Sequence, residues 1–133
     1  MKKIIFALCL LSTVTSCAVF DYPKRFAGYS IANFENEKEG RFSFKVNIPS
    51  EKAYNKCKLF LFEKKLNVNF ESKKKKYIVA SKFTVLFEYC LDSTEVAFFV
   101  RRENDETSTI EVISNNSMLA KFVFAEMQKY FGL

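Results

Sequence analysis

The sequence predicts a two-layer α+β domain in which both helices cover one face of an antiparallel sheet. Three observations support this prediction. Apolar residues alternate strictly between residues 40 and 48, apolar stripes with helical spacing follow near residues 51–66 and 119–131, and strand-like segments stand in a row between those stripes. Consecutive strands favour antiparallel pairing, so the expected element order is β-α-β-β-β-α.

The first strand carries an apolar residue at every second position from 42 to 48, and Pro49 ends it. Ser50 is the expected N-cap of the following helix, where Glu51 lies near the positive end of the helix dipole. The helix is expected to end at residue 65 or 66, and an extended conformation over residues 59–62 is the alternative. Its apolar face comprises Ala53, Tyr54, Cys57, Phe60 and Leu61.

The middle of the chain predicts the remaining strands. Residues 67–76 are expected to form a loop or an irregular strand. Residues 77–91 are rich in β-branched and aromatic residues, which predicts a long strand. Residues 95–102 and 107–114 predict a hairpin whose turn is at residues 103–106. In this hairpin Phe98 and Phe99 point to opposite faces.

The last helix has three candidate N-caps in Asn115, Asn116 and Ser117, and Gly132 is its expected stop. The stripe that it is expected to bury comprises Leu119, Phe122, Val123, Met127, Tyr130 and Phe131.

The N-terminus has the layout of an export signal. Lys2 and Lys3 precede eight apolar residues, Ile4–Leu11, and this run is too short to span a bilayer about 30 Å thick. The following stretch Val14-Thr15-Ser16-Cys17 resembles the lipobox of bacterial lipoproteins, a resemblance that covers residues 1–17 only. An ordinary signal peptide or an uncleaved anchor is the alternative.

The lipobox resemblance implies cleavage before Cys17, a diacylglyceryl thioether on Cys17 and, in most such proteins, an acylated new N-terminus. Several acyl chains exceed what stable membrane anchoring requires. Ala18 stands where Asp tends to retain Gram-negative lipoproteins in the inner membrane, so the resemblance implies an outer-membrane location in the cell envelope.

This interpretation divides the chain into a signal peptide (1–16), a lipidated cysteine with a tether (17–39) and one α+β periplasmic domain (40–133). A short strand is expected at Phe26–Ile31 within the tether. Removing 16 of the 133 residues leaves 117, which is the length of one domain, and the loss of Lys2 and Lys3 reduces the net charge from +6 to +4.

Two of the four cysteines, Cys57 and Cys90, remain for a disulfide once Cys9 leaves with the signal and Cys17 takes lipid. An exported chain is in an oxidising compartment, where an even number of cysteines favours pairing. Closing this loop would contribute roughly 3–4 kcal/mol in the chain-entropy model. Two buried thiols are the alternative. The strand alternation places Cys90 opposite the phenylalanine face, so pairing requires a bulge or a different helix face.

The composition argues against catalysis. Histidine is absent, which removes the commonest general base near neutral pH, and no phosphate-binding glycine motif occurs. Ser81 and Lys82 are adjacent in a strand and point to opposite faces, so they form no local dyad. Asp105 and Glu106 lie in a solvated turn. We therefore expect no enzyme activity, no metal and no cofactor, and the export signal argues against a nucleic-acid partner.

Charge is segregated along the chain. Residues 52–82 carry ten lysines against two glutamates, and residues 83–117 carry two arginines against seven carboxylates. The run Lys73, Lys74, Lys75 and Lys76 is therefore a candidate anion contact, with a solvated lysine-rich turn as the alternative. Phe83 or Phe99 could form an exposed aromatic patch on the sheet face that the helices leave bare, and the alternative is that the long tether packs against this face.

These observations predict a membrane-anchored, non-catalytic envelope lipoprotein that binds another envelope protein through its sheet face or C-terminal helix. One alternative is a binder of anionic lipid or polyanion through residues 52–82, and another is a blocking lipoprotein of phage or plasmid type.

Overall fold

The computed structural model describes residues 29–81 and 95–133. The chain divides into two compact units after Asn33. Of the first unit, the structure describes only the beginning of helix α3 (Tyr29–Asn36). The second unit, Phe34–Leu133, contains the other elements.

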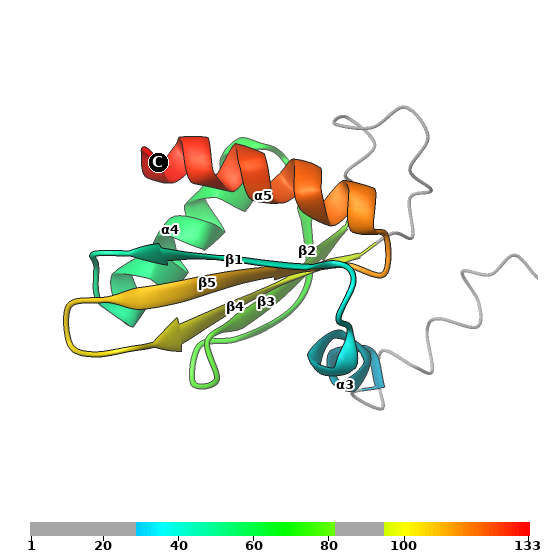
Figure 1. The fold of residues 1–133 in the computed structure, drawn as a ribbon, viewed down its shortest axis with the longest axis horizontal. Helices are drawn as coiled ribbons and strands as arrows, with labels where there is room; N and C mark the ends of the chain where they lie inside the picture. Colours follow the sequence, from blue (N-terminus) through cyan, green and yellow to red (C-terminus); the bar gives the residue numbers. More distant parts are fainter. Residues whose placement is uncertain (1–28, 82–94) are drawn as a thin grey trace, which may run out of the picture. The chain divides into compact units, whose positions relative to one another are not determined.

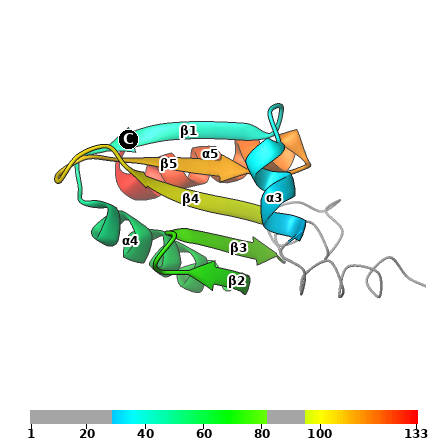
Figure 2. The same cartoon turned by 90° about the horizontal axis from the view of Figure 1, so that it is seen from below.

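A five-stranded antiparallel sheet forms the centre of the second unit, and two helices cover one of its faces (Figure 1). Figure 2 shows the strand order β1-β5-β4-β3-β2, which places the first strand beside the last. The α+β class and the antiparallel sheet with helices on it are confirmed. The elements are β1 (Arg41–Val46), α4 (Ser50–Glu63), β2 (Asn67–Ser72), β3 (Tyr77–Ser81), β4 (Val96–Arg102), β5 (Ser108–Ile113) and α5 (Ser117–Phe131).

The core lies between the two helices and the sheet. Helix α5 packs against β1 and β5, and α4 packs against β3, β4 and β5. The register pairs Phe44 with Ile110 and Phe98 with Val112, so the alternate side chains of these strands meet on the helix side. The predicted apolar face of α4 is confirmed, since all five of its members are buried.

The short strand expected at Phe26–Ile31 is wrong where the structure describes it, because Tyr29 to Asn36 are helical; residues 26–28 lie outside the described part. A helix end leaves backbone carbonyls without partners. Here the Arg41 guanidinium donates hydrogen bonds to the carbonyls of Phe34 (3.0 Å), Glu35 (2.8 Å) and Glu37 (3.0 Å). A side chain from the first strand therefore satisfies the end of a helix within the expected tether.

Helix α4 begins without the side-chain cap that we expected from Ser50. Ser50 is already helical, Pro49 occupies the N-cap position, and its carbonyl accepts a hydrogen bond from the Ala53 N–H at 2.9 Å. Proline at this position has no N–H to leave unsatisfied. The helix ends at Glu63, and Lys65 then adopts a left-handed conformation with φ of 56°.

For residues 67–76, the irregular strand is confirmed over Asn67–Ser72, and residues 73–76 form a turn. The strand is β2, which pairs with β3 and shifts register between Val68 and Phe70. The strand expected over 77–91 ends at Ser81 in the described part, and residues 82–91 lie outside it.

The predicted hairpin and the last helix are confirmed. β4 pairs with β5, and the Glu103 N–H donates to the Thr107 carbonyl across the turn. Asn116 caps α5 by accepting from the Leu119 N–H at 3.1 Å, and Gly132 ends it in the left-handed conformation with φ of 81°.

Candidate functional site

Cys57 lies fully buried between α4 and the sheet, and its thiol has no disulfide partner among residues 29–81 and 95–133. Burial raises the pKa of Cys57 to about 12, so the thiol is protonated and unreactive near neutral pH. Cys90 and Cys17 lie outside the described residues. The Cys57–Cys90 disulfide and the lipidation of Cys17 therefore stay predictions.

The lysine run of residues 73–76 forms the turn between β2 and β3, and half of its charge is already paired. Lys73 Nζ lies 3.1 Å from Glu51 Oε1, and Lys76 Nζ bonds the other oxygen of the same carboxylate. Lys76 also donates to the Lys73 carbonyl and lies over the Tyr54 ring, 5.6 Å from its centroid. Hydrogen bonds from Lys76 and Lys73 hold the pKa of Glu51 below its ordinary value.

Lys74 and Lys75 differ from these two lysines. Both are exposed, and neither forms an ion pair with any residue of ranges 29–81 and 95–133. The candidate anion contact through the whole run is thus narrowed to Lys74 and Lys75, because the Glu51 carboxylate in the first turn of α4 engages both Lys73 and Lys76 and offsets one of their two charges.

The side of α4 that faces away from the sheet carries two exposed apolar residues. Leu59 is 50% exposed and Phe62 is 81% exposed. The same side of the helix carries Lys52 and Asn55, because these four positions follow at spacings of three, four and three. Sequence reasoning missed this pair, although Leu59 and Phe62 fall opposite the predicted apolar stripe, which is the signal that could have revealed it.

Ion pairs and ring contacts line both flanks of α4. Towards α5, the Lys56 Nζ lies 4.5 Å from the centroid of the Phe131 ring. Towards β2, the Lys58 Nζ lies 2.8 Å from the carboxylate of Glu71, and this pairing lowers the pKa of Glu71. Both flanks are therefore held by side-chain contacts, and the side between them is open.

The C-terminal end of the same helix is joined to α5. Lys64 lies 3.4 Å from Glu126, which also pairs with Lys129 at 2.9 Å. Hydrogen bonds from Lys129 and Lys64 lower the pKa of Glu126. This carboxylate therefore stays ionised between two ammonium groups and is not available to neutralise the outer side of α4.

The aromatic patch expected at Phe99 is wrong, because Phe99 is only 5% exposed. Its register partner Tyr77 lies 6.0 Å away between ring centroids, and the Arg101 guanidinium lies 5.7 Å from the Phe99 ring. These neighbours shield the ring on the sheet face opposite the helices. Phe83, the other candidate for this patch, lies outside the described residues.

Several acidic groups of the described residues are bonded to basic side chains. Three acidic side chains with lowered pKa values, Glu51, Glu71 and Glu126, each bond to lysine. Asp105 pairs with Arg102 in the hairpin turn.

Across ranges 29–81 and 95–133, no three His, Cys, Asp or Glu side chains lie close enough to hold a metal ion. Within the same ranges, no helix is long and apolar enough to cross a membrane.

No protein-family model matches this chain, and no curated protein is similar to it in sequence.

Proposed function

We propose that this chain is a lipid-anchored protein of the bacterial cell envelope, with a non-catalytic binding domain formed by residues 34–133. The observation that carries the proposal is the stretch Val14-Thr15-Ser16-Cys17 directly after a basic and apolar export signal. In this proposal Cys17 carries the acyl chains, and the domain stands on the membrane, by default the outer membrane because Ala18 follows Cys17.

Two features of the described domain support binding over catalysis. A general acid or base needs a pKa near the working pH, and its environment must provide that shift. The acidic side chains with a resolved shift in the domain move the other way, since lysine neighbours lower the pKa values of Glu51, Glu71 and Glu126. The exposed apolar pair on α4, by contrast, is a feature that binding surfaces share.

Intact mass of the protein purified from membranes tests the proposal. We expect a chain that lacks residues 1–16 and carries added acyl mass, and a Cys17→Ser variant that is neither acylated nor cut at this position. Alkylation with and without reductant on the same sample tests the Cys57–Cys90 disulfide. An unacylated wild-type chain that keeps residues 1–16 would overturn the lipoprotein proposal.

A further inference from the structure

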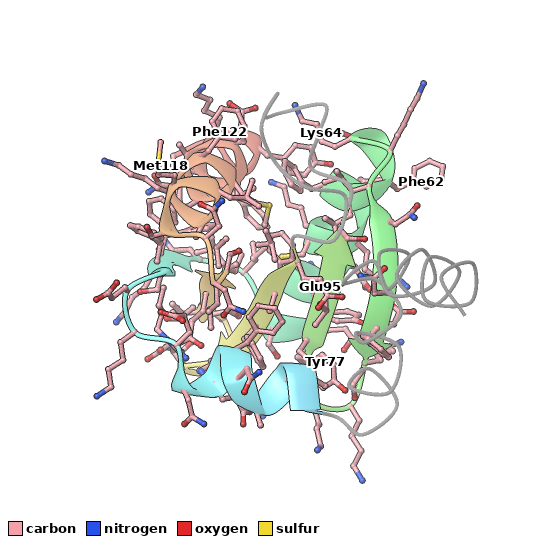
Figure 3. All side chains as sticks on the ribbon, turned by 90° about the vertical axis from the view of Figure 1, so that its right-hand side faces the viewer. Phe62, Lys64, Tyr77, Glu95, Met118 and Phe122 are labelled. Atoms are coloured by element: carbon pink, nitrogen blue, oxygen red, sulfur yellow. The ribbon has the colours of Figure 1, made fainter. Side chains whose placement is uncertain are left out.

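Leu59 and Phe62 form an apolar pair on the outer side of α4. They are three residues apart, so they lie on one side of the helix, and they are 50% and 81% exposed. Figure 3 shows the Phe62 side chain pointing away from α4, with Met118 on the opposite side of the helix layer. Met118 therefore does not belong to this pair, which is a local feature of α4.

Unpaired positive charge surrounds the apolar pair. Helix α4 and the two residues after it contain five lysines against two glutamates. Lys52 near the start of α4 and Lys65 just after its end are both exposed, and neither has an ion-pair partner within the described ranges. Of the nearby carboxylates, Glu51 and Glu71 are already bound by other lysines. Glu63, which is exposed beside Phe62, is hydrogen-bonded with Tyr130 of α5. The outer side of α4 thus presents two apolar side chains between Lys52 and Lys65, in a stretch where five lysines outnumber two glutamates.

This combination fits a lipid surface better than a protein surface. Protein interfaces favour Arg, Tyr and Trp and are depleted in Lys, because a compact ammonium group gives little directional bonding. Helices that lie at a membrane interface combine Phe and Leu, which enter the headgroup region, with Lys, which is attracted to anionic lipid. Each lysine near an anionic bilayer contributes roughly fivefold in affinity.

We infer that the outer side of α4 docks on a bilayer containing anionic phospholipid, with Leu59 and Phe62 in the headgroup region and Lys52 and Lys65 beside the phosphates. The inference rests on the proposed function, in which the acylated Cys17 holds the chain at a membrane. The anchor keeps the domain near the bilayer, and the α4 surface determines which side of the domain meets it.

The absence of tryptophan from the chain permits a direct test. A Phe62→Trp variant carries one reporter at a position that is already exposed. The membrane-purified protein is reconstituted into vesicles of phosphatidylglycerol and phosphatidylcholine, or of phosphatidylcholine alone. We expect the Trp emission to shift to shorter wavelength, and brominated acyl chains to quench it, only in the phosphatidylglycerol vesicles and less at high salt. A Ser43→Trp control, on an exposed position of β1, is expected to show neither effect.

Two matched charge variants locate the contact. In the Phe62→Trp background, Lys52→Gln with Lys65→Gln is expected to lower the ratio of docked to undocked protein about 25-fold, at roughly fivefold for each lysine. Lys74→Gln with Lys75→Gln removes the same charge from the β2–β3 turn and is expected to retain most of the docking. The reverse ranking would assign the contact to the turn and overturn the inference.

The failures of the two proposals are distinguishable. An acylated Phe62→Trp protein whose tryptophan is unquenched in anionic vesicles would keep the anchor and overturn the docking surface, leaving α4 to a protein partner. A protein without acyl chains would overturn the lipoprotein proposal. In that case the same Phe62→Trp chain is added to preformed vesicles, where salt-sensitive quenching would still support docking and its absence would contradict it.

Discussion

Arg41 connects three parts of the second unit through one guanidinium group. It donates to the carbonyls of Phe34, Glu35 and Glu37, and its Nη1 lies 3.2 Å from Glu111 Oε2 on β5. The planar arrangement of its donors allows several carbonyls and a carboxylate to be bonded at once, which an ammonium group cannot reproduce. Arg41 therefore holds the segment before β1 to the sheet.

An Arg41→Lys substitution is expected to lower the free energy of unfolding by about 1–3 kcal/mol, because charge-assisted hydrogen bonds are lost and carbonyls are left without partners. Urea denaturation at neutral pH measures the loss. Arg101→Lys is the matched control, since Arg101 also bonds Glu111 but its side chain is 53% exposed against 25% for Arg41. The control is expected to lose less than about 1 kcal/mol. Equal losses would show that the carbonyl contacts contribute little.

Cys57 makes stability depend on pH in the alkaline range when the protein is reduced. Burial raises the pKa of Cys57 from 9.0 to about 12. Between these values the unfolded thiol releases its proton while the folded thiol keeps it. The stabilisation is therefore fully present below about pH 9 and is lost as the pH rises towards 12, at about 1.4 kcal/mol per pH unit.

Cys57→Ala is expected to remove this slope between pH 9 and 10. Tyr54, whose pKa is raised from 10.0 to about 12, contributes mainly above pH 10, because below that pH the unfolded tyrosine keeps most of its proton as well. Urea unfolding with reductant present, at several pH values from 7 to 10, measures the effect. The variant is expected to be less stable at pH 7, and its deficit is expected to shrink as the pH rises. Parallel pH profiles for the two proteins would contradict the buried-thiol argument.

At the scale of elements, the junction of β1 with β5 depends on a glycine. The Ser114 N–H donates to the Gly40 carbonyl at 3.0 Å. Gly40 directly precedes β1 and Ser114 directly follows β5, so this bond extends the strand pairing beyond the pair Arg41 and Ile113. A Cβ added to Gly40 would lie 1.8 Å from the Ser114 carbonyl oxygen, which is backbone and cannot turn aside. Close approach of two backbones therefore requires glycine here.

Gly40→Ala is expected to lower the free energy of unfolding by about 2–3 kcal/mol. The added methyl group would push the N-terminal end of β1 away from the Ser114 carbonyl at the end of β5. Gly132→Ala is the matched control. Gly132 has φ of 81° and no neighbour within 4 Å of an added Cβ, so only the left-handed conformation opposes alanine, at roughly 1 kcal/mol. Chemical denaturation of both variants compares the two costs. A larger loss for Gly132→Ala would refute the steric argument.

At the scale of the whole second unit, carboxylate–lysine pairs link separate elements. Glu51 on α4 binds the β2–β3 turn, Glu71 on β2 binds α4, and Glu126 on α5 binds the residue that follows α4. The lysines lower the pKa of each carboxyl group below the ordinary value of 4.5. The stabilisation is therefore present above about pH 4.5 and is lost as the pH falls further, because the unfolded chain binds protons first.

The triple variant Glu51→Gln, Glu71→Gln and Glu126→Gln is expected to lose less stability than the natural chain between pH 6 and pH 3. The urea midpoint at each pH provides the measurement. A second triple variant, Glu103→Gln, Asp105→Asn and Glu106→Gln, makes the same change in net charge within the hairpin turn. It is expected to keep the acid-dependent loss of the natural chain. If both triple variants behave alike, net charge and not the specific pairs governs the acid response.

The sequence by itself determined the elements whose pattern is local. The alternation of β1, the buried stripe of α4, the hairpin of β4 and β5, and the Asn116 and Gly132 ends of α5 follow from backbone periods and caps within a few residues. The lysine run was also visible as composition. The lipobox resemblance is likewise local, but residues 1–28 lie outside the described part and its meaning stays a prediction.

Only the tertiary structure decided which of these features meet. Residues distant in the chain meet in the pairing of β1 with β5, in the ion pairs of Lys73 and Lys76 with Glu51, and in the shielding of Phe99. The exposure of Phe62 depends likewise on which side of α4 the sheet covers. Local periodicity predicts which residues share a face of a helix or strand. Burial and ion pairing depend on which distant segment packs against that face, and no short stretch of the sequence identifies that segment.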